Sequence, residues 1–284
     1  MRAFSADSHP GHKRGHNEDC YQASPEQQLW LVADGVGGHS NGEVASAIVR
    51  DTLDKDLAKG SSLIDAIHHS HAEILKEIAT REGSNMGSTV VALHLKESAY
   101  EVAWVGDSRA YLFDGEKIKQ ITRDHNPVSE MLARGAITPE QAANHPERNV
   151  LSQSLGVSDT ITVSPDRIRG EIQTGQQILL CSDGLTDELT DSEIEKIMSV
   201  ERNPDDQVKA LIQGALDSGG RDNVTVVVVG EKTEQSDNAP RPTRNRDTLS
   251  AAQAVNAPAG AGHDKMVWIL LATMVTLAIL WMVW

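Results

Sequence analysis

The chain has 284 residues, 39% of them hydrophobic, and is long enough to bury a core in one large domain or two small ones. Its 41 acidic and 26 basic residues give a net charge of −15, which argues against a nucleic-acid-binding protein because such proteins neutralise phosphates with a basic surface. Two cysteines are too few for a disulfide framework, and the first residues lack the apolar run of a secretory signal. We therefore expect the bulk of the chain in the cytoplasm.

The composition changes sharply after Gly230. Residues 1–230 alternate short apolar runs, helical patterns and glycine-marked turns, which predicts a folded domain. Residues 231–265 are rich in Ala, Pro, Asn, Ser, Thr and Arg and almost lack bulky apolar side chains, so we expect a flexible linker. Acidic and basic residues balance within the linker, so the net charge of −15 belongs to the first 230 residues.

The final segment, residues 266–284, contains no charged residue. As a helix it would be roughly 28 Å long, close to the hydrocarbon thickness of a bilayer, and it carries tryptophans near both ends, where such rings favour the interface. A buried core helix or an interfacial helix fits less well, because the segment is distant from the domain along the chain and has no polar face. We predict a single-pass helix in the cytoplasmic membrane. Lys265 and the linker arginines lie on its N-terminal side, which places residues 1–265 in the cytoplasm.

Apolar runs and helical periodicity predict the elements of the domain in chain order. Leu29-Trp30-Leu31-Val32 is typical of a buried strand and leads into Asp34-Gly35, and two helices follow over 42–59 and 62–80. Further strands are predicted over 88–95, 100–105, 109–113, 117–121, 177–181 and 224–229, several joined by tight turns such as Asp114-Gly115. Residues 126–150 show no strand pattern and are predicted to be a small helical excursion. Short strands with a few long helices predict an α+β fold in which two antiparallel sheets are flanked by helices.

Four short acidic elements follow apolar runs and stand beside glycine or another small residue. They contain Asp34, Asp107, the pair Asp183 and Asp187, and Asp222. Strand ends aim side chains at a common edge of a sheet, and several converging carboxylates repel one another unless a cation neutralises them. Oxygen ligands without His or Cys favour Mg²⁺ or Mn²⁺ over zinc. A single Asp-Gly pair would be a turn, but four elements placed alike favour a metal site.

These elements, together with three others, resemble the PPM-type metal-dependent serine/threonine protein phosphatases of the compact bacterial kind. The matching motifs cover about residues 5–230 and are, in order, Arg14-Gly15-His16-Asn17-Glu18-Asp19, Val32-Ala33-Asp34-Gly35-Val36-Gly37-Gly38-His39, Met86-Gly87-Ser88-Thr89, Val105-Gly106-Asp107-Ser108-Arg109, Thr122-Arg123-Asp124-His125, Ser182-Asp183-Gly184-Leu185 and Arg221-Asp222-Asn223-Val224-Thr225. The resemblance implies a four-layer α-β-β-α sandwich in residues 1–230, with a flap at about 126–150 beside the active site.

The resemblance also implies a role for individual residues. Asp34 would bridge two metal ions and the Gly35 carbonyl would bind one of them, while Asp183 and Asp222 hold the other. Glu18 and Asp19 would orient metal-bound waters, and Arg14 would hold the substrate phosphate by a forked contact. Asp107 and Asp187, with Asp183, match positions that bind a weaker third metal.

The activity implied is hydrolysis of phosphoserine and phosphothreonine in proteins. Two Mn²⁺ or Mg²⁺ ions would activate a water for in-line attack on phosphorus. Partners would be phosphorylated proteins, among them a serine/threonine kinase and its substrates, in bacterial signal transduction at the membrane. We expect a monomeric catalytic domain. The alternative is a catalytically silent phosphoprotein-binding scaffold at the membrane, which loss of a metal aspartate would favour; none is lost.

The chain departs from the family pattern in two places. Some members have a histidine, proposed as the general acid, directly after the Asp-Gly pair, whereas this chain has Val36, which cannot donate a proton. His9 stands where many members have an aspartate two residues before a glycine. A further cluster, His68, His69 and His71, invites a metal interpretation, but His69 points away from the other two on a helix, so we interpret these residues as surface histidines.

Overall fold

The computed structural model describes residues 2–37, 41–81, 85–157, 162–201 and 203–230. All of them lie within one unit, Met1–Ser236. No helix in these ranges is long and apolar enough to cross a membrane. The predicted linker over 231–265 and the predicted transmembrane helix over 266–284 lie outside the described residues.

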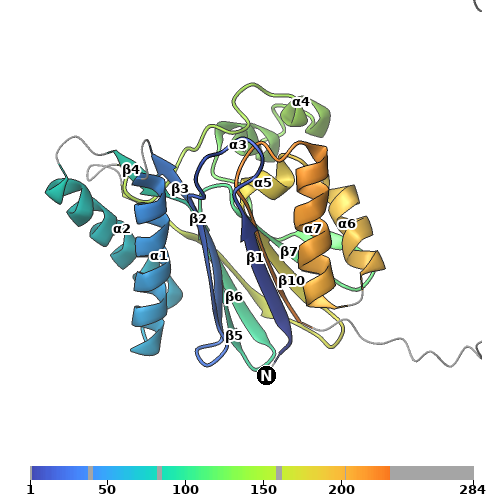
Figure 1. The fold of residues 1–284 in the computed structure, drawn as a ribbon, viewed down its shortest axis with the longest axis horizontal. Coiled ribbons are helices and arrows are strands. Elements are labelled where there is room, and N and C mark those ends of the chain that lie inside the picture. Colours follow the sequence, from blue (N-terminus) through green and yellow to red (C-terminus); the bar gives the residue numbers. More distant parts are fainter. Residues whose placement is uncertain (1, 38–40, 82–84, 158–161, 202, 231–284) are drawn as a thin grey trace, which may run out of the picture. The chain divides into compact units, whose positions relative to one another are not determined.

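Two antiparallel sheets form the centre of this unit (Figure 1). The first has the strand order β1-β11-β10-β7-β8. Its members are β1 (Phe4–His9), β7 (Arg109–Phe113), β8 (Ile118–Gln120), β10 (Gln177–Cys181) and β11 (Val224–Val229).

The second sheet has the strand order β2-β3-β5-β6-β9, with β4 paired to the far end of β3. Its members are β2 (Asp19–Ser24), β3 (Leu29–Gly37), β4 (Met86–Ser88), β5 (Val90–Lys96), β6 (Ala99–Val105) and β9 (Asp166–Glu171). β3 continues past its apolar half, so that Asp34 and Gly35 lie inside the strand.

Helices cover the outer faces of both sheets, and Figure 1 shows the resulting four layers. Helices α1 (Asn41–Ala58) and α2 (Leu63–Thr80) lie on the side of the second sheet, and α6 (Asp191–Val200) and α7 (Pro204–Ser218) lie on the side of the first. Two short helices, α3 (Pro127–Ala133) and α4 (Pro139–Ala143), lie at one end of the sandwich, and α5 (Asp183–Thr186) is a single turn directly after β10.

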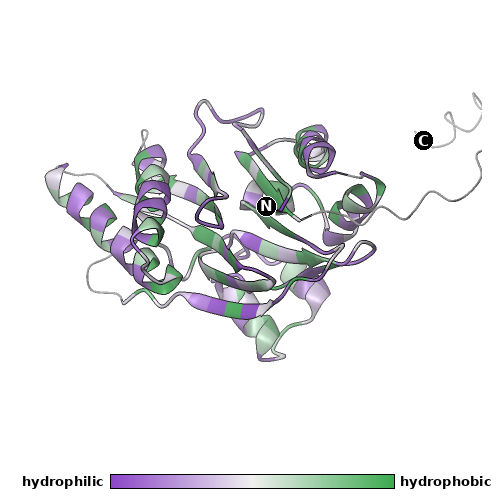
Figure 2. Cartoon of the chain, turned by 90° about the horizontal axis from the view of Figure 1, so that it is seen from below, coloured by the Kyte–Doolittle hydropathy of each residue, from purple (hydrophilic) through white to green (hydrophobic). Residues whose placement is uncertain are grey.

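Three hydrophobic clusters fill the three interfaces between layers, and strand alternation explains how one strand serves two of them. In β3, Leu29 and Leu31 face the α1–α2 layer, whereas Trp30 and Val32 face the opposite sheet. β11 divides its valines in the same way, between the α6–α7 layer and the space between the sheets. Figure 2 shows hydrophobic residues along these strands and polar residues on the outer sides of the helices. The packed sheets hold the motif residues together at one edge of the sandwich.

The predicted elements are largely confirmed, with two corrections. The helix predicted over 42–59 is α1 and the one over 62–80 is α2. The single strand predicted over 88–95 is two strands, because the chain bends at Thr89, between β4 and β5. The predicted elements do not include strands β1, β2 and β9 or helices α5, α6 and α7. The region 126–150 contains α3 and α4 and no described strand.

Candidate active site

Asp34 lies where β3 leaves the ladder it shares with β5 and begins to pair with β4. Its backbone N–H donates to Thr89 Oγ1 at 3.0 Å, and its carbonyl accepts the Thr89 N–H at 2.8 Å and the Ser88 hydroxyl at 3.1 Å. The Met86–Thr89 motif therefore holds the backbone of Asp34 from one side. Its carboxylate projects from a position that hydrogen bonds fix.

Gly35 is a glycine because three backbone segments meet there. A Cβ at this position would lie 2.1 Å from the Gly42 carbonyl oxygen and 2.7 Å from that of Glu18. The Gly35 N–H donates to the same Glu18 carbonyl at 3.2 Å. The Glu18 carboxylate in turn accepts the N–H of Gly42 in the first turn of α1, so Glu18 and Gly35 share one anchoring point.

Asp183 and Asp222 come from different segments that touch through their backbones. Asp183 is the first residue of α5, and Asp222 stands in the loop between α7 and β11. A Cβ at Gly184 would lie only 1.9 Å from the Asn223 carbonyl oxygen. This contact leaves no room for a side chain and brings the two aspartates to one place, where the charge of Asp222 raises the energy of the ionised form of Asp183.

Asp19 is buried beneath the same site. Its Oδ2 accepts hydrogen bonds from the hydroxyls of Ser182 and Thr225, both at 2.7 Å. Burial, only partly offset by these two bonds, raises the Asp19 pKa to about 7. A hydroxyl from β11 and one from the residue that directly follows β10 thus orient the carboxylate that is predicted to position water.

Burial and the proximity of other carboxylates raise the pKa values of the aspartates in the site. Burial, together with the charges of Asp19, Asp183 and Asp107, raises the pKa of Asp34 well above its ordinary value. Burial, with the charges of Asp187 and Asp222, raises the Asp183 pKa to about 6. Asp183 is therefore close enough to interact with five other predicted carboxylates, which lie up to 203 positions apart in the chain: Asp19, Asp34, Asp107, Asp187 and Asp222.

Arg14 reaches the site from the loop between β1 and β2, where its guanidinium donates to Asp222 Oδ2 at 2.7 Å. About half of its side chain is exposed (52%). The hydrogen bond to Asp222 raises the Arg14 pKa, and Glu18 and Asp34 add to the effect. The predicted phosphate-binding cation is thus tethered to a predicted metal ligand, with further N–H groups left to reach a substrate.

The donor set suits a divalent cation. Among the described residues, no group of three or more His, Cys, Asp or Glu side chains already meets the geometry of a metal site. Yet Asp19 Oδ1 and Asp183 Oδ1 are buried without a hydrogen-bond partner in the described part of the chain, and neighbouring carboxylates repel one another. A hard cation removes both penalties by taking oxygen ligands, so these residues fit Mn²⁺ or Mg²⁺.

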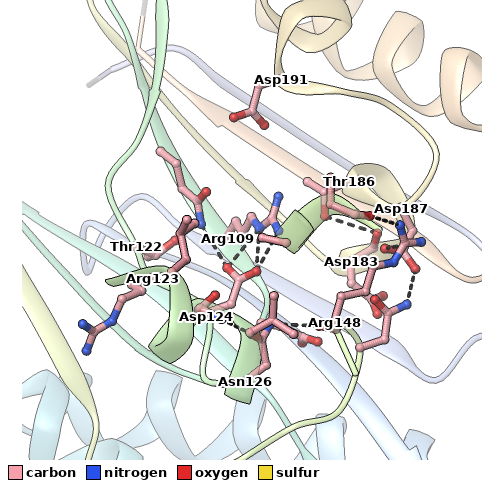
Figure 3. Close-up of a pocket in the computed structure, with 18 of the residues that line it drawn as sticks. Arg109, Thr122, Arg123, Asp124, Asn126, Arg148, Asp183, Thr186, Asp187 and Asp191 are labelled. Carbon is pink, nitrogen blue, oxygen red and sulfur yellow. Dashed lines mark hydrogen bonds and ion pairs between the residues drawn. The ribbon is translucent and has the colours of Figure 1, made fainter. Parts of the chain in front are cut away.

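The outer set, Asp107 and Asp187, lies on a cavity of about 700 Å³ that also reaches Asp183. Asp107 is almost fully buried (8% exposed), and burial, with the charge of Asp183, raises its pKa to about 8. Asp187 Oδ2 accepts the side-chain amide of Asn149 at 2.6 Å. Figure 3 shows residues that line the cavity, with Arg109 and Asp124 joined by dashed lines, Asp183 and Asp187 close together, and Asp191 apart from them.

Asn223 is a site residue for which the sequence predicts no role. Its side-chain oxygen accepts the Glu18 N–H at 2.8 Å, and its amide donates to the carbonyls of Pro10 and His16 at 3.0 and 2.9 Å. One buried side chain thus shapes the loop that carries Arg14. Only the position of Asn223 directly after Asp222, in a quoted motif, could have pointed to it.

The histidine cluster is resolved by its contacts. His69 lies against Asp56, and its other ring nitrogen is 3.6 Å from Glu73. His71 turns toward the body of the domain, where its Nδ1 accepts the Gly156 N–H at 2.9 Å. His69 therefore pairs with carboxylates at the surface, and His71 attaches the loop that contains Gly156.

Known proteins match both the sequence and the fold. The sequence profile of the family described as "Protein phosphatase 2C" matches residues 1–131. Over 233 residues the chain is 36% identical to the serine/threonine phosphatase stp of Listeria innocua, an alignment that covers 77% of this chain and 92% of that protein. The chain belongs to the protein phosphatase 2C family. It is also 33% identical to the protein phosphatase PhpP of Streptococcus pneumoniae over 80% of its own length. Membership in this family confirms the predicted class, protein serine/threonine phosphatase, over the silent scaffold.

Solved structures of family 2C phosphatases share this architecture. The Mycobacterium tuberculosis serine/threonine phosphatase PstP/Ppp matches with a TM-score of 0.71 at 33% identity, covering 82% of this chain and 99% of that one. The catalytic domain of a phosphatase PstP solved in complex with two manganese ions matches with a TM-score of 0.72 at 31% identity, covering 82% and 99%. Both confirm the two antiparallel sheets flanked by helices, and the second accords with a cofactor of Mn²⁺ or Mg²⁺.

Proposed function

We propose that this chain removes phosphate from phosphoserine and phosphothreonine side chains of proteins, in opposition to a serine/threonine kinase. The observation that carries the proposal is the convergence of Asp34, Asp183 and Asp222 at one edge of the sandwich. Within the described ranges, Asp19 Oδ1 and Asp183 Oδ1 are buried there without a hydrogen-bond partner. We assign Asp34, the Gly35 carbonyl, Asp183 and Asp222 to the two metal ions. Asp107 and Asp187 form the set for a weaker third ion on the adjoining cavity.

Other residues of the site bind the phosphate and orient water. When bound, the divalent ions supply a water activated for attack on phosphorus. Arg14 binds and orients the phosphate through a forked, charge-assisted contact. Glu18 and Asp19, each held by its own hydrogen bonds, orient water at the site. Val36 lines a separate cavity of about 290 Å³ with Leu151 and Val163, so this position offers no proton donor.

The activity test is direct. The purified chain with Mn²⁺ should hydrolyse p-nitrophenyl phosphate and a phosphothreonine peptide. Asp183→Asn should lower kcat by about 100-fold or more, because loss of a metal ligand removes several kcal/mol of stabilisation. Asp217→Asn, a change at an exposed residue near the end of α7, is the matched control and should keep full activity. No turnover by the wild-type chain, or equal turnover in Asp183→Asn, would refute the enzyme.

We also propose that residues 266–284 anchor this phosphatase in the cytoplasmic membrane, with the catalytic unit on the cytoplasmic side. The support is the uncharged, tryptophan-flanked sequence of the segment and the basic residues before it. A flexible linker over 231–265 has a root-mean-square reach on the order of 30–35 Å. Phosphoproteins at or near the membrane, such as a membrane-bound kinase, are therefore the substrates we expect.

A further inference from the structure

The two segments that carry Asp183 and Asp222 project beyond the sheet that supports them. Strands β10 and β11 pair as far as Cys181 and Val226, and the last main-chain bond between them runs from the Ser182 N–H to the Thr225 carbonyl at 3.1 Å. Beyond that bond no ladder sets the distance between the two aspartates. Contacts outside the sheet must do so.

The first such contact is the backbone approach of Gly184 to Asn223 described above. It lies directly beside both aspartates. Together with the Ser182–Thr225 bond it limits how closely the two segments approach. A second point outside the sheet, farther along both segments, is needed to limit their rotation relative to each other.

Glu188 and Arg221 form that second point. The Arg221 backbone N–H and side-chain Nε both donate to Glu188 Oε1, at 2.9 and 2.8 Å, and a terminal nitrogen of Arg221 lies 3.2 Å from Oε2. The same terminal nitrogen donates to the Asp187 carbonyl at 3.0 Å. Arg221 thus binds the end of the turn that Asp183 begins, one residue away from Asp222.

The burial of the two side chains is unequal. The Glu188 side chain is 2% exposed, whereas that of Arg221 is 63% exposed. The loop passes around the carboxylate at Gly219, whose φ of +152° favours glycine. A Cβ added at this position would lie 2.9 Å from Glu188 Oε2. The carboxylate therefore sits inside the turn that precedes Asp222, which distinguishes this pair from an ordinary surface ion pair.

We infer that Glu188 and Arg221 are positioning residues, which hold the segment carrying Asp183 and the segment carrying Asp222 at the separation that the second metal ion requires. The inference rests on the proposed metal assignment. Neither residue belongs to the predicted set of metal ligands. Their effect passes through the backbone of residues 221 and 222 on one side and the Asp187 carbonyl on the other.

If the Glu188–Arg221 pair were only a structural clasp, its removal would have a different effect on metal affinity than if it positions the metal ligands. A clasp contributes to the free energy of unfolding and leaves the folded site as it was. A positioning pair also sets the metal affinity, and removal of outer partners of metal ligands typically weakens metal binding by about 10-fold to 100-fold. Metal affinity, measured on folded protein, therefore separates the two roles.

The experiment uses the full chain with Glu188→Ala, Glu188→Gln and Arg221→Lys. Mn²⁺ binding is measured by isothermal titration calorimetry, and the Mn²⁺ concentration for half-maximal p-nitrophenyl phosphate hydrolysis is measured alongside. We expect Glu188→Ala to weaken Mn²⁺ binding by roughly 10-fold or more. Glu188→Gln should have a smaller effect because its amide oxygen can still accept the backbone N–H. Arg221→Lys should be intermediate because lysine keeps the charge and loses the fork.

The matched control is Glu101→Ala. It breaks an ion pair of the same kind, Arg169 Nε to Glu101 at 2.8 Å, between β6 and β9. It should leave Mn²⁺ affinity unchanged. Unaltered Mn²⁺ affinity in Glu188→Ala protein that remains folded by circular dichroism would overturn the inference, as would absence of Mn²⁺ binding by the wild-type chain. If wild-type protein binds Mn²⁺ but hydrolyses neither substrate, the proposed function fails, and calorimetry still decides the role of the pair.

Discussion

At the scale of single residues, the site is a set of carboxylates whose charged forms the fold disfavours. Burial raises the pKa of Asp183 to about 6, of Asp19 to about 7 and of Asp107 to about 8, whereas an unfolded aspartate titrates near 3.9. Between about pH 4 and pH 8 the folded state therefore binds more protons than the unfolded state. By linkage, metal-free stability is highest at the acidic end of this window and is lost as pH rises through the folded pKa values.

The melting temperature in a chelator should accordingly fall between pH 5 and pH 8, and Mn²⁺ should reverse the trend by stabilising the ionised carboxylates. Differential scanning fluorimetry with EDTA or Mn²⁺ measures both. Asp107→Asn should raise the melting temperature at pH 8 in EDTA, because a neutral amide carries no charge to bury. The exposed Asp217→Asn should not. A melting temperature in EDTA that rises over this pH range would contradict the account.

At the scale of helices and strands, the sequence predicts the central strands of each sheet better than the strands at its edges. Central strands such as β10 and β11 are continuous apolar runs, and their predicted bounds are those of the structure. The missing strands β1, β2 and β9 are all at sheet edges, where one ladder and one apolar row suffice. β9, with sequence DRIRGE, alternates half-buried and exposed positions and contains a single isoleucine. Helix α7 did carry a readable pattern, with Val208, Leu211, Ile212 and Ala215 buried at helical spacing.

The candidate site was predictable to the extent that local motifs carry it. Aspartates beside glycine at the ends of apolar runs were visible in the sequence, and the structure brings them together. Their supporting partners were not visible, because Ser182 and Thr225 bind Asp19 across 163 and 206 positions of the chain. No local pattern marks a serine or threonine as the partner of a distant carboxylate.

The base of residues 126–150 is attached to β7 by one buried ion pair. Arg109 donates three hydrogen bonds to Asp124, at 2.7 to 3.1 Å, and Asp124 is nearly buried. Asp124→Asn would leave the guanidinium without its counter-charge, so we expect a loss of about 3 kcal/mol in the free energy of unfolding. Denaturant titration measures this loss, and hydrogen exchange should show faster exchange over 126–150 than in the wild type.

The control for this pair is Glu130→Gln, which breaks the exposed ion pair between Glu130 and Arg134 in α3. An exposed pair contributes little, so this change should lie within about 0.5 kcal/mol of the wild type. Equal effects of the two substitutions would show that the buried pair has no special part in holding the region.

At the scale of the whole molecule, the catalytic unit and the C-terminal segment follow different physical rules. Residues 1–230 carry the entire net charge of −15 and build three clusters of buried apolar residues from alternating strand faces. Residues 266–284 carry no charge and no alternation. The three apolar clusters of the described residues all lie within Met1–Ser236. We therefore expect residues 1–236 to fold without the final segment, so that the two are separable by experiment.

We therefore expect the full chain, expressed in bacteria, to remain with membranes through a carbonate wash, while residues 1–236 are released and keep activity toward p-nitrophenyl phosphate. Val275→Arg, near the middle of the segment, should weaken retention, because an arginine at the centre of a spanning helix costs about 2.5–3.5 kcal/mol. Val275→Ile keeps the apolar character and should be retained like the wild type. Release of the full wild-type chain by carbonate would refute a spanning helix. Retention of residues 1–236 would instead place the membrane contact on the catalytic unit.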